Sequence, residues 1–245
     1  MVYRNMLLHL PTTTSTMDVA RAAVQQGDTT SIVLADEQTS GRGRLNRPWL
    51  TFPAPYGMAA TFIVPGGPYP HLPLIAALAL HQAVLGLQPE TQNPTPEILI
   101  KWPNDLLLSG KKAAGILCET ISSGAGAPAA LVGIGCNIAA PAYVPESFQG
   151  TFLGLSTTPE ALARAISTCM QALLTLYQQQ GWSDTLHNSY LQSCATLGQN
   201  LTWQRGTPQQ LTGYARSLTK DGHLELVAED GTVHVIHSGE IFDTR

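Results

Sequence analysis

The chain has 245 residues, of which 44% are hydrophobic and 12% charged, and its formal net charge is −4. This composition is typical of a soluble globular protein, and the length favours one large domain plus one small domain. No Lys/Arg-rich run offers to neutralise phosphates, and no segment approaches about 18 consecutive apolar residues. Binding to nucleic acid, export by a signal peptide and membrane insertion are therefore not expected.

The first predicted elements alternate between helix and strand. Apolar residues recur at helical spacing over residues 17–26, after a run of threonine and serine that suits a helix cap. Short β-branched runs at 31–35 and 58–64 predict strands on either side of a loop at 41–48 that is rich in glycine and arginine. Residues 74–87 are almost wholly apolar at helical spacing, which indicates a buried helix.

The middle of the chain is predicted to form an antiparallel meander followed by two helices. Strand-like runs separated by turn residues occur at 97–101, 105–108, 113–120 and 130–138. Thr158-Pro159-Glu160 combines a capping residue, a proline and an early acid, and predicts the start of a long helix that ends at Gly181. A shorter helix is expected at residues 183–191.

Beyond residue 192 the pattern changes to short strands, which are expected at 200–204, 210–218, 223–228 and 232–236. Asp221-Gly222 and Asp230-Gly231 lie between strands, and such dipeptides supply the positive φ that tight hairpins require. We therefore expect an α+β domain over residues 1–192, with a mostly antiparallel sheet backed by helices. A small β-barrel is expected over residues 193–245.

Positive charge is concentrated in the loop Gly41-Arg42-Gly43-Arg44-Leu45-Asn46-Arg47-Pro48-Trp49. Arginine offers planar, bidentate donors to a carboxylate or phosphate, and glycine lets backbone N–H groups approach an anion. The chain has only 13 lysines and arginines, and three of them fall in this short loop. This concentration favours an anion-binding loop over the alternative, an ordinary basic surface loop.

Two further segments carry candidate site residues. Lys101-Trp102-Pro103-Asn104-Asp105 closes one predicted strand and opens the next, so the sheet should hold its polar side chains rigidly. In Lys112-Ala113-Ala114-Gly115-Ile116-Leu117, the glycine weakens the strand unless a ligand or another backbone comes close. For the first segment the alternative is a break between strands, in which Asn104 and Asp105 only accept hydrogen bonds from turn amides. For the second segment the alternative is that Lys112 is an ordinary solvated lysine at the end of a strand.

In their order and spacing, these three segments together resemble the active-site signature of biotin protein ligases. The resemblance extends over nearly the whole chain, through Ser15-Thr16, Gln38, Gly133-Ile134-Gly135-Cys136-Asn137 and Ser238-Gly239-Glu240. It implies a class II synthetase-like catalytic domain and a C-terminal SH3-like barrel. Because the catalytic region starts almost at Met1, the chain resembles the enzyme-only class, without the DNA-binding module of ligases that double as repressors.

The resemblance implies roles for the matched positions. Biotin would contact Ser15, Thr16, Met17, Gln38, Arg42, Gly43, Arg44, Lys112, Gly115, Ile116, Gly133 and Gly135. ATP would contact Arg44, Arg47, Trp49, Asn104, Lys112 and Asn137. The catalytic groups would be Lys112, Arg42, Arg44 and Asp105, with Asp105 positioning Lys112 or a metal, although no dedicated metal site is expected.

Two positions depart from the family pattern. Met17 stands where the family often has asparagine, which puts one polar contact in question. Asn46 stands where the family often has glycine, and asparagine tolerates the left-handed backbone that glycine would supply.

The implied reaction joins biotin to ATP, supplied with Mg²⁺, to give biotinyl-5′-AMP and pyrophosphate. Biotin then passes to a lysine of a biotin carboxyl carrier domain of a carboxylase. The four cysteines are scattered without a C-x-x-C pair, which favours reduced thiols in a cytoplasmic protein. A homodimer stays open, since exposed sheet edges can pair two subunits or receive an acceptor strand.

Other functions are less well supported by the residues. A lipoate or octanoate ligase of the same architecture would need an apolar tunnel for its flexible acyl chain, and a non-catalytic biotin-binding regulator would not need Arg42, Arg44 and Lys112 together. A metal site at His234 and His237 is disfavoured, because in a strand the two side chains would point to opposite faces. A cysteine nucleophile is disfavoured because Cys118 and Cys136 have no recognisable partner histidine.

Overall fold

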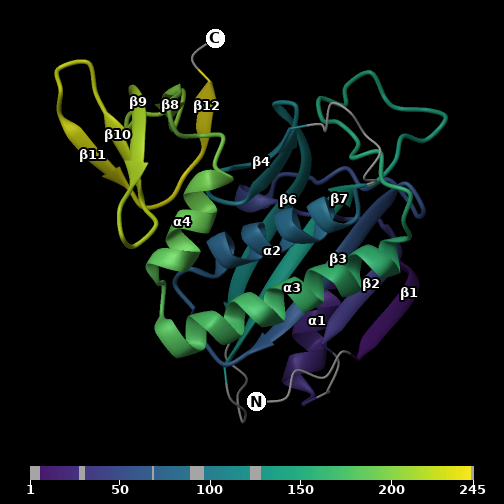
Figure 1. Cartoon of the computed structure of the whole chain (residues 1–245). Coiled ribbons are helices and arrows are strands. Elements are labelled where there is room, and N and C mark those ends of the chain that lie inside the picture. Colours follow the sequence, from purple (N-terminus) through teal and green to yellow (C-terminus); the bar gives the residue numbers. More distant parts are fainter. Residues whose placement is uncertain (1–5, 28–30, 68, 89–96, 122–127, 244–245) are drawn as a thin grey trace.

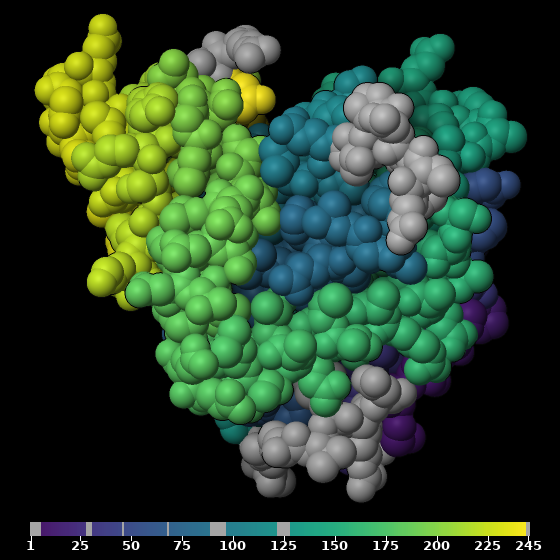
Figure 2. Space-filling model, in the orientation of Figure 1, coloured from purple at the N-terminus to yellow at the C-terminus, as the bar shows by residue number. Residues whose placement is uncertain are grey.

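The computed structural model describes residues 6–27, 31–67, 69–88, 97–121 and 128–243. In these ranges the chain forms a seven-stranded sheet with helices on both faces, followed by a five-stranded sheet (Figure 1). The space-filling view in Figure 2 shows the yellow C-terminal strands along one side of the molecule, next to the light green segment that includes α4 (Asp184–Gln192). Within the same ranges, no helix is both long and apolar enough to cross a membrane.

The large sheet is mixed but mostly antiparallel, as predicted. In spatial order its strands are β1 (Leu7–Thr13), β2 (Ile32–Gln38), β3 (Gly57–Pro65), β7 (Ala129–Asn137), β6 (Lys111–Ile121), β5 (Asp105–Leu108) and β4 (Ile98–Lys101). Strands β1 and β2 pair in parallel, and every other neighbouring pair is antiparallel. The predicted meander is confirmed as β4 to β7.

Strand β1 is missing from the sequence-based prediction. Its sequence, Leu-Leu-His-Leu-Pro-Thr-Thr, contains Pro11 and has no regular alternation of apolar and polar residues. Proline donates no ladder hydrogen bond and is tolerated on edge strands, and β1 lies at the edge of the sheet. The strand therefore depends on pairing with β2 more than on its own propensity.

Helices cover both faces of this sheet. α2 (Leu72–Gly86) and α3 (Pro159–Gln180) pack on one face, and α1 (Thr16–Gln25) packs on the other. α2 is apolar around most of its surface because it lies between the sheet and α3. The predicted limits of α3 are confirmed: the Thr158 hydroxyl accepts a hydrogen bond from the Ala161 N–H at 3.1 Å, and Gly181 follows the last turn with φ of 66°.

Alternate residues of the central strands supply two separate cores. Ile32 and Leu34 join the core beneath α2 and α3, whereas Val33 packs with Met17 and Ala20 of α1. Successive strand residues point to opposite faces of a sheet, so each strand feeds both cores. The face that carries α1 is only partly covered by that short helix.

The C-terminal strands form an antiparallel sheet in the order β11 (Val233–Ile236), β10 (Leu224–Val227), β9 (Leu211–Leu218), β8 (Asn200–Trp203) and β12 (Ile241–Asp243). The four predicted strands are confirmed, and the hairpin glycines Gly222 and Gly231 have φ of 77° and 84°. β12 was not predicted, because it has three residues and follows Gly239. Closure of this sheet into a barrel stays a prediction.

Hydrogen bonds join the two parts of the chain. The segment after α4 bonds to β4, where the Ile100 N–H donates to Ser193 O at 2.7 Å and the Ala195 N–H donates to Ile100 O at 2.9 Å. Farther along, the indole N–H of Trp102 donates to Gly222 O at 3.0 Å. The predicted division between residues 192 and 193 therefore falls within a bonded segment and stays a prediction.

The core under α2 and α3 yields a test of stability. Phe62 of β3 is fully buried, so Phe62→Ala should lower the free energy of unfolding by about 3–5 kcal/mol through lost burial and a new cavity. Urea denaturation measures the change. Leu85→Ala, at an exposed position of α2, should change it by less than about 0.5 kcal/mol, and equal losses in the two variants would contradict this description of the core.

Candidate active site

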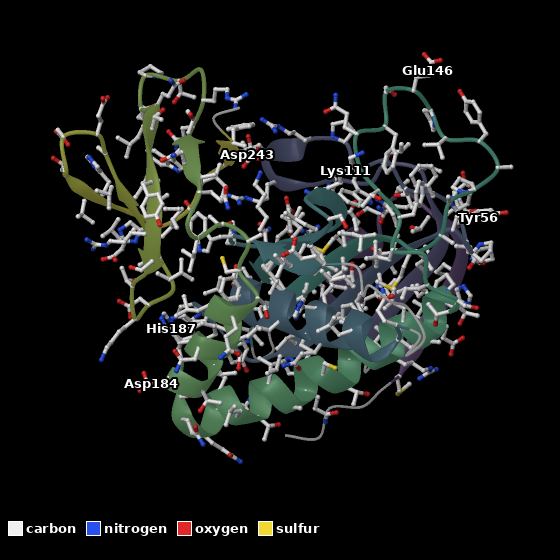
Figure 3. The ribbon with its side chains drawn as sticks, turned by 45° about the horizontal axis from the view of Figure 1, so that its top comes forward. Tyr56, Lys111, Glu146, Asp184, His187 and Asp243 are labelled. Carbon is white, nitrogen blue, oxygen red and sulfur yellow. The ribbon has the colours of Figure 1, made fainter. Side chains whose placement is uncertain are left out.

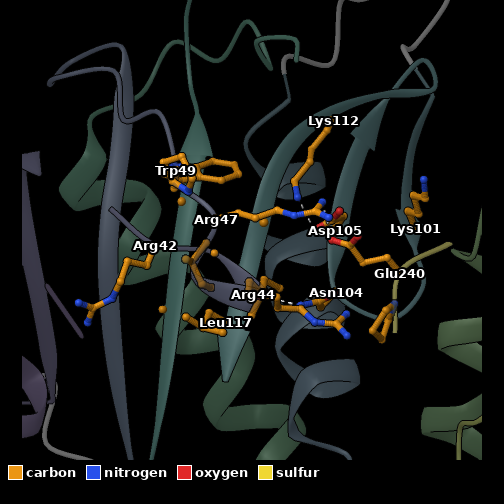
Figure 4. Close-up of a pocket in the computed structure, with 18 of the residues that line it drawn as sticks. Arg42, Arg44, Arg47, Trp49, Lys101, Asn104, Asp105, Lys112, Leu117 and Glu240 are labelled. Carbon is orange, nitrogen blue, oxygen red and sulfur yellow. Dashed lines mark hydrogen bonds and ion pairs between the residues drawn. The ribbon is translucent and has the colours of Figure 1, made fainter. Parts of the chain in front are cut away.

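A cavity of about 570 Å³ lies on the α1 face of the large sheet and extends to the C-terminal sheet (Figure 4). Except for Asn137, every residue predicted for the site lines this cavity: Ser15, Thr16, Met17, Gln38, Arg42, Gly43, Arg44, Arg47, Trp49, Asn104, Asp105, Lys112, Gly115, Ile116, Gly133 and Gly135. Segments far apart in the sequence thus meet at one place. The roles predicted for the individual residues stay predictions.

One end of the cavity is polar and uncharged. Both the backbone N–H and the hydroxyl of Thr16 donate to the side-chain oxygen of Gln38, at 2.9 and 3.1 Å. The hydroxyl of the buried Thr61 donates to the Thr16 hydroxyl at 2.9 Å. Ser15 precedes α1, but its side chain makes no capping hydrogen bond. This network fixes small neutral donors and acceptors at the start of α1.

Glycines of β6 and β7 form the floor of the cavity. A Cβ atom at Gly135 would lie 2.3 Å from the indole Nε1 of Trp49, and one at Gly115 would lie 3.1 Å from the same ring. A Cβ atom at Gly133 would lie 2.7 Å from the sulfur of Met17. Only glycine allows these side chains to lie directly against the backbone of the sheet.

Three of the cations in the cavity are paired with carboxylates from other segments. Lys112 Nζ lies 2.7 Å from Asp105 Oδ1, and Arg47 Nη1 lies 2.7 Å from Glu240 Oε1. Arg42 Nη2 lies 2.6 Å from Asp18 Oδ1. Figure 4 shows that the Arg42 side chain points away from Lys112 and the other arginines.

The loop that carries the arginines is a small hairpin. Arg42 and Pro48 form an isolated antiparallel bridge, and the Gly43 N–H donates to Arg47 O at 2.8 Å. The left-handed residue in this loop is Leu45, with φ of 56°, and not Asn46. The ammonium of Lys112 lies 5.4 Å from the centroid of the Trp49 ring, so the end of the hairpin contacts the strand that carries the lysine.

Hydrogen bonds with Thr196 and Tyr190 hold the segment that carries Asn104 and Asp105. The Trp102 N–H donates to the Thr196 hydroxyl at 2.8 Å, and the Tyr190 hydroxyl donates to Pro103 O at 2.9 Å. Asn104 is buried, and its side-chain amide donates to Ile116 O on β6. These bonds place the turn rigidly at the edge of the cavity.

Asn137 lies outside the lining of the cavity. Its side-chain amide donates to Thr151 O at 3.0 Å, and the Thr151 N–H donates to Lys112 O at 2.8 Å. Asn137 therefore anchors the end of the loop that follows β7 to the strand that carries Lys112. Figure 3 shows Glu146 at the outer end of this loop, and Gln149, nearer its end, does line the cavity.

Sequence reasoning assigned no site role to the C-terminal residues Gly239, Glu240, Ile241 and Phe242, which also line the cavity. Gly239 has φ of 121°, and the Trp203 indole donates to Ser238 O at 2.9 Å, which holds this segment in place. The resemblance to biotin protein ligases includes Ser238-Gly239-Glu240, but it assigned no role in the site to this segment. Its position becomes evident only when the C-terminal sheet is seen against the cavity.

The sequence predicts neither a dedicated metal site nor a cysteine nucleophile among the described residues. They contain no cluster of three or more His, Cys, Asp or Glu side chains able to hold a metal ion. Burial raises the pKa of Cys118 and of Cys136 to about 12, so both thiols stay protonated at neutral pH and are poor nucleophiles.

Residues 9–138 match the model of the Biotin/lipoate A/B protein ligase family. The chain belongs to this family. A biotin--[acetyl-CoA-carboxylase] ligase of Paracoccus denitrificans is 34% identical over 221 residues, which cover 86% of this chain and 89% of that protein. The resemblance predicted from the motifs is thereby confirmed.

Two solved structures of this ligase family support the fold. The chain is similar to the biotin protein ligase from Aquifex aeolicus in complex with biotin and ATP, with a TM-score of 0.79, 23% identity and coverage of 98% of both chains. It is also similar to the biotin protein ligase from Leishmania major in complex with biotinyl-5-AMP, with a TM-score of 0.63, 30% identity and coverage of 95% of this chain and 99% of that one. The predicted fold class is confirmed.

The polar network yields a test that needs no ligand. Thr61→Val keeps the shape of the side chain but removes its hydrogen bond to Thr16, and should lower the free energy of unfolding by about 1 kcal/mol. Urea denaturation measures this loss. Thr12→Val, at an exposed position of β1, should change it by less than about 0.5 kcal/mol. Equal unfolding midpoints for Thr61→Val and the unchanged protein would contradict the assigned network.

Proposed function

We propose that the chain is an ATP-dependent biotin protein ligase that forms biotinyl-5′-AMP and transfers biotin to a lysine of a biotin carboxyl carrier domain. One observation carries the proposal. A single cavity joins a neutral polar end, a glycine floor and a group of cations, which match the ureido ring, the apolar bicycle and the carboxylate of biotin. Its relative from Paracoccus denitrificans is named as a ligase for acetyl-CoA carboxylase.

In this proposal the polar end binds the ureido ring. Ser15, Thr16 and Gln38 exchange hydrogen bonds with its N–H and carbonyl groups, and Thr61 holds the Thr16 hydroxyl in place. The bicycle lies against Gly115, Ile116, Gly133 and Gly135, where a side chain would block it. Met17 packs beside Gly133 and contributes an apolar contact.

In the first step of the reaction the cations offset the repulsion between the biotin carboxylate and the α-phosphate of ATP. The biotin carboxylate attacks the α-phosphorus of ATP, and a bond forms between a carboxylate oxygen and this phosphorus. The bond between the α-phosphorus and the oxygen that bridges it to the β-phosphorus breaks, and pyrophosphate leaves. Two unit charges about 4 Å apart repel by roughly 4 kcal/mol at an effective dielectric of about 20. Lys112 and Arg44 offset this repulsion and stabilise the charge that develops on the phosphoryl oxygens.

Other residues position these groups and the nucleotide. Asp105 holds the Lys112 ammonium, and Arg42 takes part once its guanidinium leaves Asp18 for the substrate. Arg47, Trp49, Asn104 and Asn137 are assigned to the nucleotide, with Asn137 acting through the loop it anchors. Mg²⁺ enters with ATP as part of the substrate.

In the second step the acceptor amine attacks the acyl carbon of biotinyl-5′-AMP. An amide bond forms, the bond from the acyl carbon to the phosphate oxygen breaks, AMP leaves, and the amine gives up a proton. The proposed acceptor is a carboxylase carrier domain. The proposed location is the cytoplasm, and the free state of the four cysteines supports it.

A direct assay tests the proposal against the lipoate or octanoate alternative. The protein is incubated with ATP, Mg²⁺ and a carrier domain, and biotin and lipoate are offered in separate reactions. We expect the mass of biotinyl to be added to the carrier lysine with biotin, because the polar end of the cavity suits a ureido ring and not an alkyl chain. Mass gained from lipoate alone would refute the assignment, and biotin binding without turnover would indicate a regulator.

The lysine assignment has its own test. Lys112→Ala should lose most pyrophosphate release, at least about 100-fold, because it removes a cation from the point where carboxylate and phosphate meet. Lys111→Ala, the adjacent exposed lysine, should release pyrophosphate at nearly the unchanged rate. An unaltered urea midpoint shows that the Lys112 variant is folded, and release of pyrophosphate at the unchanged rate would end the assignment.

A further inference from the structure

A second cavity, of about 240 Å³, adjoins the first. The two cavities share Arg44, Trp102, Pro103, Asn104 and Leu117 in their linings. The second cavity therefore lies beside the first, at the side of the Asn104 turn.

The walls of this second cavity come from both parts of the chain. The start of α2 contributes Pro73 and Leu74, and the turn between β9 and β10 contributes Asp221 and His223. His237 lies in the connection between β11 and β12. Asp221 and His237 are exposed, whereas Leu74 is buried, so the charged and polar groups lie at the outer end.

These walls are fixed in place. The Trp102 indole donates to Gly222 O at 3.0 Å. A Cβ atom at Gly222 would lie 2.3 Å from Leu74 Cδ1, so the turn is seated closely on α2. These contacts fix the walls of the second cavity where the turn between β9 and β10 meets α2 and Trp102.

The chemistry of the lining suits one kind of side chain. The inner walls are apolar, with Leu74, Trp102 and Leu117. At the outer end Asp221 is the one carboxylate among the described lining residues, and the rings of His223 and His237 lie side by side with centroids 4.2 Å apart. A carboxylate at the entrance and apolar walls behind it are complementary to an alkylammonium group, in charge and in shape.

The proposed function requires such a group to reach the adenylate. We propose that the second cavity admits the lysine side chain of the acceptor protein, which Asp221 attracts and whose proton His223 or His237 accepts. The inference rests on the proposed function and names the route of its second substrate. In this proposal biotin fills the polar end and the glycine floor of the first cavity, so the amine enters from the side of the second cavity.

The proton has to leave before the bond forms. A nitrogen attacks through its lone pair, which an ammonium group does not have, and Arg44 at the inner end repels a cation. An imidazole at the entrance takes the proton, and the amine then moves inward between the apolar walls. The amide bond forms at the acyl carbon as AMP leaves.

The test starts from biotinyl-5′-AMP supplied to the intact protein, so that only transfer is measured. Asp221→Lys should slow transfer to a carrier domain about tenfold by repelling the ammonium. Transfer to hydroxylamine, a small amine that does not need the cavity, should stay unchanged, as should pyrophosphate release from biotin and ATP. Asp230→Lys is the matched control, because Asp230-Gly231 is the equivalent turn between β10 and β11 and lines neither cavity.

The histidines are tested in the same way. His223→Gln combined with His237→Gln should slow carrier transfer at least about tenfold, whereas His234→Gln on β11 should not. Carrier transfer within about twofold of the unchanged rate in both Asp221→Lys and the double variant would overturn the cavity assignment. Equal loss of carrier and hydroxylamine transfer would also overturn it. Failure of the unchanged protein to release pyrophosphate would refute the ligase proposal itself, which is a different result.

Discussion

The arrangement of the site depends on one constraint, the missing side chains on the cavity face of β6 and β7. Gly115, Gly133 and Gly135 leave a strip of bare backbone in the middle of the sheet. Trp49 and Met17 lie directly against that strip. The indole brings the arginine hairpin to the sheet, and Met17 brings the start of α1, so the polar and cationic ends of the cavity are set by contact with the same floor.

Partly exposed ion pairs hold the cations of the cavity above this floor. Asp18, Asp105 and Glu240 come from three different elements, and each pairs with one cation of the cavity. The paired side chains are partly exposed, and such pairs contribute only about 0–1 kcal/mol to stability. These pairs orient the cations, and because each contributes little, an anionic ligand can displace a carboxylate with only a small loss of stability.

Much of the fold and site could be predicted from sequence, because the strongest signals are local. The apolar pattern of α2, the cap of α3 and the Asp-Gly hairpins each depend on neighbouring residues, and all are found in the structure. The three motifs also predicted residues that share one cavity.

The features that were missed depend on distant partners. β1 contains Pro11 and is stabilised by pairing with β2, and β12 has only three residues. The contact of Asn137, the last residue of β7, with ATP stays a prediction, and the structure adds that its amide donates to Thr151 O. Ser238-Gly239-Glu240 matched the family pattern, but Glu240 reaches the cavity because the C-terminal sheet packs beside it, and the pattern did not predict that contact.

The bond from the Trp102 indole to Gly222 O links the terminal sheet mechanically to the reaction centre. Trp102 stands two residues before Asn104, so a tilt of the terminal sheet would pull on the peptide that carries Asn104 and Asp105, and through Asp105 on Lys112. A protein that docks on the terminal sheet could in this way adjust the alignment of the lysine from outside the cavity, without entering it.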